Sequence, residues 1–333
     1  MTLPLNQPAF KPVWEGYLAD PFVWRYEKWY YATGTGREEA ADGLGEAARP
    51  RLPEAPVFPL LRSPDLQSWT RLGNALARPD PALGNEYWAP EVACQGGRFY
   101  LYYSIGPQHQ LRVATSSEPQ GLYHDASAPL TQTPQTPFAI DASPFQDDDG
   151  QWYLFYARDF LDENSPQGYR AGTGLAVDTL ADMTRLLGEE QVVARARFDW
   201  TLFARDRGIY NRTWPEWHTL EGAHVVRRGG VYYCFYSGAC YGNDSYGVDY
   251  LTAPNPLGPW DDSGSAQGPR VLRSIPGLLR GPGHCSVVTD PNGADYLVFH
   301  AWNQALTRRQ MHIAPLVWTA EGPRVNLRLP VPV

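Results

Sequence analysis

LEGAHVVRRGGVYYCFYSG, at residues 220–238, is the stretch that decides the fold. An acid, Glu221, stands at its start, and a short apolar run leads into a basic, glycine-containing turn at residues 227–230. A second run, residues 231–237, is rich in β-branched and aromatic side chains. Two such runs separated by a short turn with glycine predict an antiparallel β-hairpin.

The same hairpin pattern occurs five times along the chain. The other copies begin at residues 19, 89, 141 and 283 and read ADPFVWRYEKWYYATGTG, APEVACQGGRFYLYYSIG, DASPFQDDDGQWYLFYARD and GHCSVVTDPNGADYLVFHAW. A second strand–turn–strand signature follows each copy, which gives about four strands per unit. Radial repetition of four-stranded sheets is typical of β-propellers. We therefore predict an all-β fold, a single five-bladed propeller of four-stranded antiparallel blades over residues 1–333, rather than a large β-sandwich.

Composition excludes several classes of partner. The 333 residues carry a net charge of −8, which disfavours nucleic acid and anionic membranes as partners. The 12 Trp and 20 Tyr suit carbohydrate binding, because sugar faces stack on aromatic rings. The four cysteines lack C-x-x-C spacing, which argues against structural zinc, and we expect them to be small buried side chains.

The N-terminal sequence has neither a basic start nor an apolar core of the kind found in secretory signals. No apolar run approaches the roughly 18 residues of a membrane span. We therefore expect a cytoplasmic protein, unless a signal has been removed.

Charged residues stand near the start of each repeated hairpin. We take five of them as equivalent positions around the axis: Asp20, Glu91, Asp141, Glu221 and His284. A single acid at a strand start is explained as a turn cap. Four acids and a histidine converging on one channel would disfavour one another's charged forms, which is costly unless a ligand or a reaction uses them. We expect at least three of the five to be functional.

The available chemistry favours glycoside hydrolysis. That reaction needs two carboxyl groups, one to protonate the leaving oxygen and one to activate water. The sequence contains no G-x-S-x-G nucleophile motif for acyl transfer. It also lacks a glycine-rich cradle or a basic clamp for phosphoryl transfer.

Five motifs carry a resemblance to a known family. They are ADPFVW (19–24), YWAPEV (87–92), IDASPF (140–145), LEGAHV (220–225) and GPGHCSVV (281–288). In this order, over nearly the whole chain, they resemble the motifs of glycoside hydrolase family 43. The resemblance implies a five-bladed propeller that inverts anomeric configuration. The family includes α-L-arabinofuranosidases, arabinanases, β-xylosidases and some galactanases.

The resemblance also implies roles for the three carboxyl groups. Asp20 matches the general base that activates water, and Glu221 matches the general acid. Asp141 matches the third carboxylate, which orients the acid and keeps its pKa raised. A neighbouring negative charge does favour the protonated form that an acid needs near neutral pH.

Further positions match parts of the family's site. His284 resembles an axial histidine that in many members lies near a water-coordinated ion, often calcium, and a bond to buried water is the alternative. Arg309 resembles an arginine that bonds substrate hydroxyls, although a surface role is also open. The chain departs from the common pattern at Ala142, Ala223 and Cys285, which bears on specificity and on the ion.

Aromatic residues beside the motifs are candidates for substrate binding. Trp88 is a candidate stacking wall for the sugar, with a place in the core as the alternative, and Phe22 and Trp302 are weaker candidates of the same kind. We expect Glu91 to bond substrate hydroxyls or neighbouring side chains.

Together these patterns predict an inverting, exo-acting glycosidase that requires no cofactor. Its expected action is release of terminal α-L-arabinofuranosyl units from arabinan- or arabinoxylan-derived oligosaccharides. Polar loops at residues 159–170 and 199–217 are long enough to close one end of the cleft, which favours exo action. A β-D-xylosidase or an endo-arabinanase on the same scaffold is the alternative. A non-catalytic sugar-binding propeller is another, but it would not need Asp20, Asp141 and Glu221 together.

Overall fold

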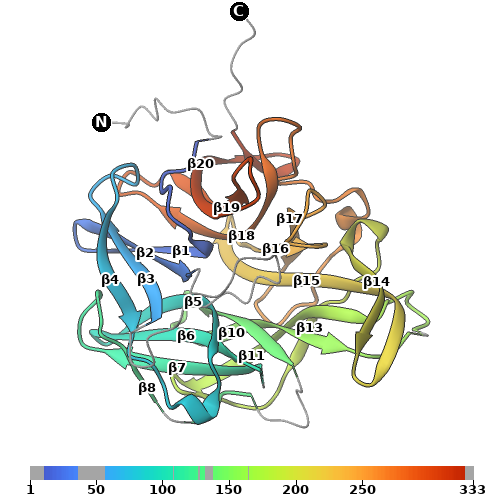
Figure 1. Cartoon of the computed structure of the whole chain (residues 1–333), viewed down its shortest axis with the longest axis horizontal. Coiled ribbons are helices and arrows are strands. Elements are labelled where there is room, and N and C mark those ends of the chain that lie inside the picture. Colours follow the sequence, from blue (N-terminus) through green and yellow to red (C-terminus); the bar gives the residue numbers. More distant parts are fainter. Residues whose placement is uncertain are drawn as a thin grey trace, which may run out of the picture.

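The computed structural model describes residues 11–36, 57–107, 109–126, 128–131, 138–163 and 165–326. The strands form five blades around a common axis, so the protein is a five-bladed β-propeller, as predicted (Figure 1). Each repeated hairpin found in the sequence forms the first two strands of a blade. In the fourth blade, the first of these strands begins several residues before the repeat. Within the described ranges, no helix is both long and apolar enough to cross a membrane.

The blades follow one another in chain order. The first consists of β1 (Ala19–Tyr26), β2 (Trp29–Thr35), β3 (Val57–Ser63) and β4 (Thr70–Leu76). The second consists of β5 (Glu86–Gln95), β6 (Arg98–Gly106), β7 (Gln110–Ser116) and β8 (His124–Asp125). The third consists of β9 (Ala139–Gln146), β10 (Trp152–Phe160), β11 (Gly172–Asp182), β12 (Arg185–Leu186) and β13 (Gln191–Ala194).

The fourth blade consists of β15 (Arg212–Arg228), β16 (Val231–Gly238) and β17 (Gly247–Ala253). The first part of β15 pairs antiparallel with β14 (Leu202–Ile209) and parallel with β11, which joins the third and fourth blades in one sheet. The fifth consists of β18 (Arg280–Thr289), β19 (Asp295–Trp302), β20 (Arg309–Thr319) and β21 (Gly322–Val325). Three short 3-10 helices, η1 (Pro81–Leu83), η2 (Asp199–Thr201) and η3 (Ser263–Gln267), lie in the connections.

The fourth blade departs from the predicted pattern. We predicted a loop at residues 199–217, but η2 and the antiparallel hairpin of β14 and β15 occupy this stretch. The turn between the two strands has no glycine. Tyr210 and Asn211 both adopt positive φ there, 57° and 55°, which suits the tight turn of a two-residue hairpin. Without glycine as a signal, the sequence pattern read as a loop.

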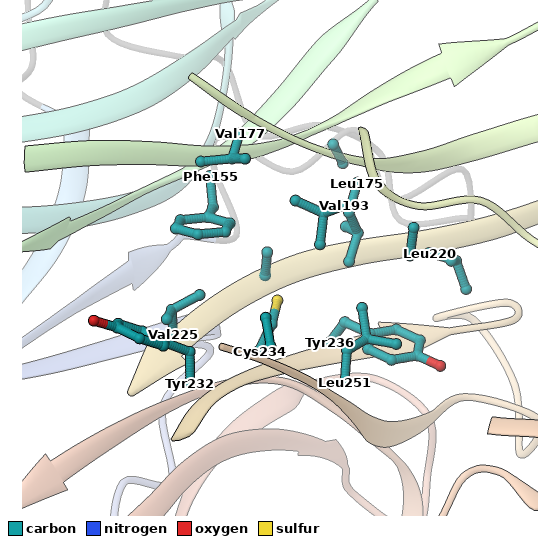
Figure 2. Close-up of a cluster of buried hydrophobic side chains, with 14 of the residues drawn as sticks. Phe155, Leu175, Val177, Val193, Leu220, Val225, Tyr232, Cys234, Tyr236 and Leu251 are labelled. Carbon is teal, nitrogen blue, oxygen red and sulfur yellow. The ribbon is translucent and has the colours of Figure 1, made fainter. Parts of the chain in front are cut away.

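Apolar side chains between neighbouring blades form the core. Figure 2 shows one such cluster, where Phe155 and Leu175 of the third blade pack against Val225 and Cys234 of the fourth. Burying one side chain such as Phe155 stabilises the fold by about 1.5–3 kcal/mol. Our expectation for the cysteines is correct for Cys234 and Cys285, which are buried, but wrong for Cys94, which is exposed, and for the half-buried Cys240.

The N-terminal segment closes the propeller by bonding to the fifth blade. The main-chain N–H of Val13 donates to the carbonyl of Met311 at 2.9 Å, and that of Leu18 donates to Arg309 at 3.0 Å. Strand β20 therefore bonds to residues preceding β1 as well as to β21. This closure brings the beginning of the first blade, with Asp20, against the fifth blade.

Candidate active site

Each inner strand has a residue in the left-handed region at the same place, where the register with the second strand shifts; β18 has a second one, Gly281, nearer its start. These five residues, which we call the axial ring, are Asp20 (φ 50°), Ala89 (47°), Asp141 (62°), Gly222 (60°) and His284 (46°). Such conformations are costly for residues other than glycine, and they gather at functional sites. The axial ring is therefore the structural repeat around which the site is built.

The axial ring corrects the equivalence that we assumed from the sequence. Asp20, Asp141 and His284 are equivalent, as expected. Glu221 lies one residue before its ring position, Gly222, and Glu91 lies two residues after its own, Ala89. The five motifs can be aligned in the sequence, but the sequence does not show where the pairing register between the first and second strands shifts.

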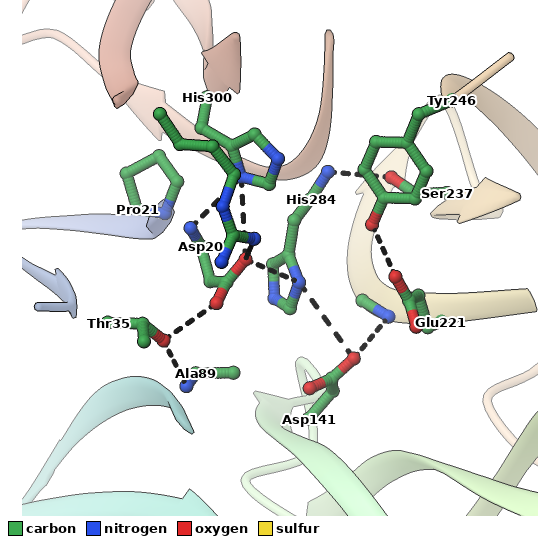
Figure 3. Close-up of polar contacts among 12 residues, drawn as sticks. Asp20, Pro21, Thr35, Ala89, Asp141, Glu221, Ser237, Tyr246, His284 and His300 are labelled. Atoms are coloured by element: carbon green, nitrogen blue, oxygen red, sulfur yellow. Dashed lines mark hydrogen bonds and ion pairs between the residues drawn. The ribbon is translucent and has the colours of Figure 1, made fainter. Parts of the chain in front are cut away.

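Side chains of the preceding blade accept a hydrogen bond from the main-chain N–H of every ring residue. We call these five bonds the latches, and Figure 3 shows those of Asp20, Ala89 and His284. The acceptors are Thr35 Oγ1 for Ala89 (2.9 Å), Ser104 Oγ for Asp141 (3.0 Å), Asp141 Oδ2 for Gly222 (3.0 Å), Ser237 Oγ for His284 (2.7 Å) and His300 Nδ1 for Asp20 (3.0 Å). Buried N–H groups need such partners. The latches thus fix the ring and, through it, the side chains that point to the axis.

Asp20 is surrounded by donors. The hydroxyl of Thr35 donates to its Oδ2 at 2.6 Å, and Arg309 donates to its Oδ1 at 3.4 Å. The Nδ1 of His284 also lies 3.4 Å from Oδ1. Burial acts to raise the pKa of Asp20, but the positive charges of His284 and Arg309 outweigh burial. The pKa of Asp20 therefore lies well below its usual range, and the group is ionised at neutral pH.

Glu221 has the opposite character. Burial is the main cause that raises its pKa to about 7, and the negative charge of Asp20 adds to it. The hydroxyl of Tyr246 donates to Glu221 Oε1 at 2.7 Å, which lowers the pKa in part. Near neutral pH this carboxyl group retains its proton for a substantial share of the time, as a general acid must.

Asp141 lies between the other two carboxyl groups (Figure 3). It accepts the N–H of Gly222, the residue next to Glu221, and its Oδ2 lies 3.8 Å from His284 Nδ1. Burial and then the negative charges of Glu221 and Asp20 raise the pKa of Asp141 well above its ordinary value. Asp141 and Glu221 therefore titrate as a pair rather than independently.

This site combines a carboxyl group whose pKa is lowered with one whose pKa is raised to about 7, which is the pairing that hydrolysis of a glycosidic bond requires. The family model for glycosyl hydrolases family 43 matches residues 9–323. The chain belongs to glycosyl hydrolases family 43. As a member of this family it is an enzyme that hydrolyses glycosidic bonds.

Several family 43 relatives are similar over most of their length. A β-D-galactofuranosidase, xynD, of Aspergillus niger is 29% identical, and the match covers 89% of this chain and 77% of that protein. An extracellular exo-α-(1→5)-L-arabinofuranosidase of Cellvibrio japonicus is 27% identical, with 75% and 72% covered. The crystal structure of a thermostable family 43 glycoside hydrolase has a TM-score of 0.74 and 28% identity, with 95% of both chains covered.

Arg309 and Trp302 adjoin the base. Arg309 is buried and donates to the hydroxyl of Tyr17 at 3.0 Å as well as to Asp20. Its guanidinium lies 5.8 Å from the ring centre of Trp302, whose indole N–H donates to the Tyr241 carbonyl. Substrate contacts by Arg309 and Trp302 stay predictions.

Trp88 and Phe22 occupy different surroundings. Trp88 is half-buried and stacks on His109, with ring centres 5.0 Å apart, so part of its surface remains open for the predicted sugar contact. Phe22 belongs to a core cluster and lies against Trp24 and His224. This packing gives Phe22 a structural role, and its contact with substrate stays a prediction.

Glu91 is buried, and its negative charge acts on Asp141 and His284. It accepts a bond from Ser143 at 2.8 Å, and its Oε1 lies 3.7 Å from His224 Nδ1. The residues two positions after the axial ring thus form a second layer along the axis. Of our two expectations for Glu91, bonding to neighbouring side chains is confirmed.

Three residues of the site were missed in the sequence: Thr35, Tyr246 and His300. Thr35 and His300 lie in the second strands of their blades, β2 and β19, within aromatic or small-residue runs that read as core. Tyr246 lies at the end of a polar loop, directly before β17. Burial lowers the pKa of His300 to about 4, so it is neutral at pH 7. Because its Nδ1 accepts the Asp20 N–H, its proton is on Nε2, and that atom has no hydrogen-bond partner within the described part of the chain. The spacing of Thr35 and His300 within their repeats is a signal that could have found them.

We also tested the site for a metal ion. Within the described ranges, no three His, Cys, Asp or Glu side chains are arranged to hold a metal directly. His284 lies between two carboxylates, and burial lowers its pKa. A calcium ion held through water near His284 therefore stays a prediction, and no step below depends on it.

Proposed function

We propose that this family 43 enzyme is an inverting, exo-acting glycosidase that releases terminal α-L-arabinofuranosyl units from arabinan- or arabinoxylan-derived oligosaccharides. The observation that carries the proposal is the opposite displacement of two pKa values, with Asp20 well below its usual range and Glu221 raised to about 7. Divergent pKa values in one site assign the base and the acid.

The reaction would proceed in one displacement. Asp20 takes a proton from a water molecule, whose oxygen attacks the anomeric carbon. The bond from that carbon to the leaving oxygen breaks, and Glu221 gives its proton to the leaving oxygen. Inversion needs room for the water, which corresponds to a separation of about 6.5–9.5 Å between the two carboxyl groups. Asp141, bonded to the N–H beside Glu221, would keep the acid oriented.

The substrate assignment is supported by the relatives and by the walls of the site. The Cellvibrio relative is named as an exo-acting arabinofuranosidase. The hairpin of β14 and β15 is tied to the third blade by a 2.6 Å bond from the Tyr210 hydroxyl to Asp159, which supports a cleft with one closed side. A closed side favours exo action.

A second candidate follows from the Aspergillus relative, which is named a β-D-galactofuranosidase. A β-D-galactofuranoside differs from an α-L-arabinofuranoside by one additional CHOH group in the exocyclic chain. The same ring contacts can therefore serve both sugars, and discrimination rests on the room beyond C4.

A panel of substrates tests the proposal. Nitrophenyl α-L-arabinofuranoside, β-D-xyloside and β-D-galactofuranoside are assayed together with debranched arabinan, using the wild type and Glu221→Gln. We expect the arabinofuranoside to give the highest kcat/KM and the arabinan to be cleaved from its ends. Lack of activity on all four, or a Glu221→Gln variant with wild-type activity, would contradict the assignment as hydrolase.

The roles of the two carboxyl groups are tested with different leaving groups. An activated aryl group leaves with little protonation, so Glu221→Gln is expected to retain part of its activity on the aryl glycoside but not on an oligosaccharide. Asp20→Asn lacks the base and should lose activity on both. Retention on the aryl glycoside by Asp20→Asn but not by Glu221→Gln would show that the roles are reversed, and equal retention by the two variants would contradict both assignments.

A further inference from the structure

Arg207 is a cation at the edge of the site whose hydrogen-bond donors are unused. It lies on β14, and its guanidinium stacks over the rings of Phe203 at 4.6 Å and Trp217 at 5.1 Å. Among the residues that the structure describes, it makes these ring contacts but no hydrogen bond or ion pair. The neighbouring arginines on the hairpin differ, since Arg205 pairs with Glu216 and Arg212 pairs with Glu163.

A chain of contacts connects Arg207 with the catalytic groups. Phe203, on whose ring the Arg207 guanidinium stacks, contacts Tyr241 with ring centres 6.2 Å apart. Tyr241 in turn lies under Arg309, 5.0 Å from its guanidinium, and Arg309 bonds Asp20. The hairpin that bears Arg207 therefore forms one wall of the active site.

Arg207 lies on β14, which pairs with β15, the strand that carries the general acid Glu221, so both residues belong to one pair of strands. The positive charge of Arg207 lowers the pKa of Glu221 and that of His109, the residue stacked on Trp88. Arg309 also acts on Glu221, but it bonds the base as well, which Arg207 does not. Because the general acid protonates the leaving oxygen, the part of the substrate beyond Glu221 is the leaving group. Arg207 thus faces the space where the leaving group lies.

The chemistry of arginine then indicates the ligand. A guanidinium presents five N–H donors and no acceptor, and stacking on two rings holds its plane without using those donors. A leaving group that is itself a sugar offers hydroxyl oxygens as acceptors, whereas a nitrophenol offers no comparable array.

We propose that Arg207 binds the hydroxyl groups of the leaving sugar and so determines the preference of the enzyme for oligosaccharides over simple glycosides. This inference rests on the proposed function, since it needs the glycone to lie between Asp20 and Glu221. Arg207 contributes binding on the leaving-group side and takes no part in proton transfer.

Two substrates with the same terminal sugar separate this role from a structural one. The Arg207→Gln and Arg207→Lys variants are compared with wild type on nitrophenyl α-L-arabinofuranoside and on α-1,5-arabinobiose. Loss of a charged hydrogen bond should raise KM for arabinobiose roughly tenfold in Arg207→Gln, with KM for the aryl glycoside unchanged. Arg207→Lys keeps the charge but loses the planar fork, and should give an intermediate KM for arabinobiose.

Arg205→Gln is the matched control, because it removes an arginine from the same strand that is paired with Glu216. It should leave both KM values unchanged. Equal rises in KM for both substrates in Arg207→Gln, or no rise for either, would overturn the inference while leaving the proposed function intact. A wild type that cleaves neither substrate would overturn both.

Discussion

At the scale of single residues, three carboxyl groups of similar chemistry take different states because their neighbours differ. Asp20 has a hydroxyl, a guanidinium and two imidazoles around it. Glu221 has only a tyrosine hydroxyl as its hydrogen-bond partner among the described residues. Both groups are withdrawn from water, so the number of donors determines whether burial or local charge controls the pKa.

The Tyr246→Phe variant tests this account of Glu221. The hydroxyl donates to the carboxylate and so favours its ionised form, which means that removing the hydroxyl raises the pKa of Glu221 further. We expect the alkaline limb of kcat/KM to move upward by roughly one pH unit, the equivalent of one hydrogen bond to a charged group. The pH profile of the variant on an arabino-oligosaccharide, whose leaving group needs the general acid, is the measurement. A downward shift would contradict the assignment of Glu221 as the acid.

At the scale of elements, the inner strands explain what the sequence could and could not predict. The hairpins follow from local alternation and turn residues, so their number and order were predictable. The left-handed residue inside each inner strand was not, because Asp20, Ala89 and His284 are not glycine and give no local signal for positive φ. The resemblance to a family singled out Asp20 and Glu221, but the geometry that makes them non-equivalent depends on pairing between strands.

Two glycines of the fourth blade test the importance of this irregularity. Gly222 has a φ of 60°, and a Cβ there would lie 3.0 Å from the ring of His284. Gly229, in the turn after β15, has a φ of 56° and open space where a Cβ would be. Replacing either with alanine should cost about 1–2 kcal/mol of unfolding free energy for the left-handed backbone.

We expect only Gly222→Ala to lose activity as well, because it alone displaces His284 and the groups beside it. Thermal unfolding and kcat are measured on both variants. Similar losses of kcat in Gly222→Ala and Gly229→Ala would indicate a general effect of instability rather than a local one.

At the scale of the whole molecule, the site forms only when the first and fifth blades meet and close the propeller. Asp20 belongs to the first blade, yet its main-chain latch and its arginine partner belong to the fifth. The acid and Asp141 come from the fourth and third blades. Five matched hairpins in the sequence imply such convergence, but the side chains that meet across blades become visible only in three dimensions.

The pH dependence of the whole enzyme follows from the two displaced pKa values. Activity requires ionised Asp20 and protonated Glu221. Because the pKa of Asp20 is lowered, activity should persist down to about pH 4, the ordinary range of an aspartate. Because the pKa of Glu221 is raised to about 7, kcat/KM should fall as pH rises through that value. A profile that instead rises above pH 7 would contradict the assignments.

The latches also separate the frame from the chemistry. Each holds its ring residue through the main-chain N–H, so the bond does not depend on the side chain of the residue that is held, although the side chain of Asp141 is itself the acceptor for Gly222. The same backbone frame thus presents five different groups at equivalent positions. They are the base Asp20, the orienting acid Asp141, His284, the hydrogen of Gly222 and the methyl group of Ala89. The methyl group of Ala89 marks the place without a task, where protein design could add a group to the site while the backbone that carries it stays in position.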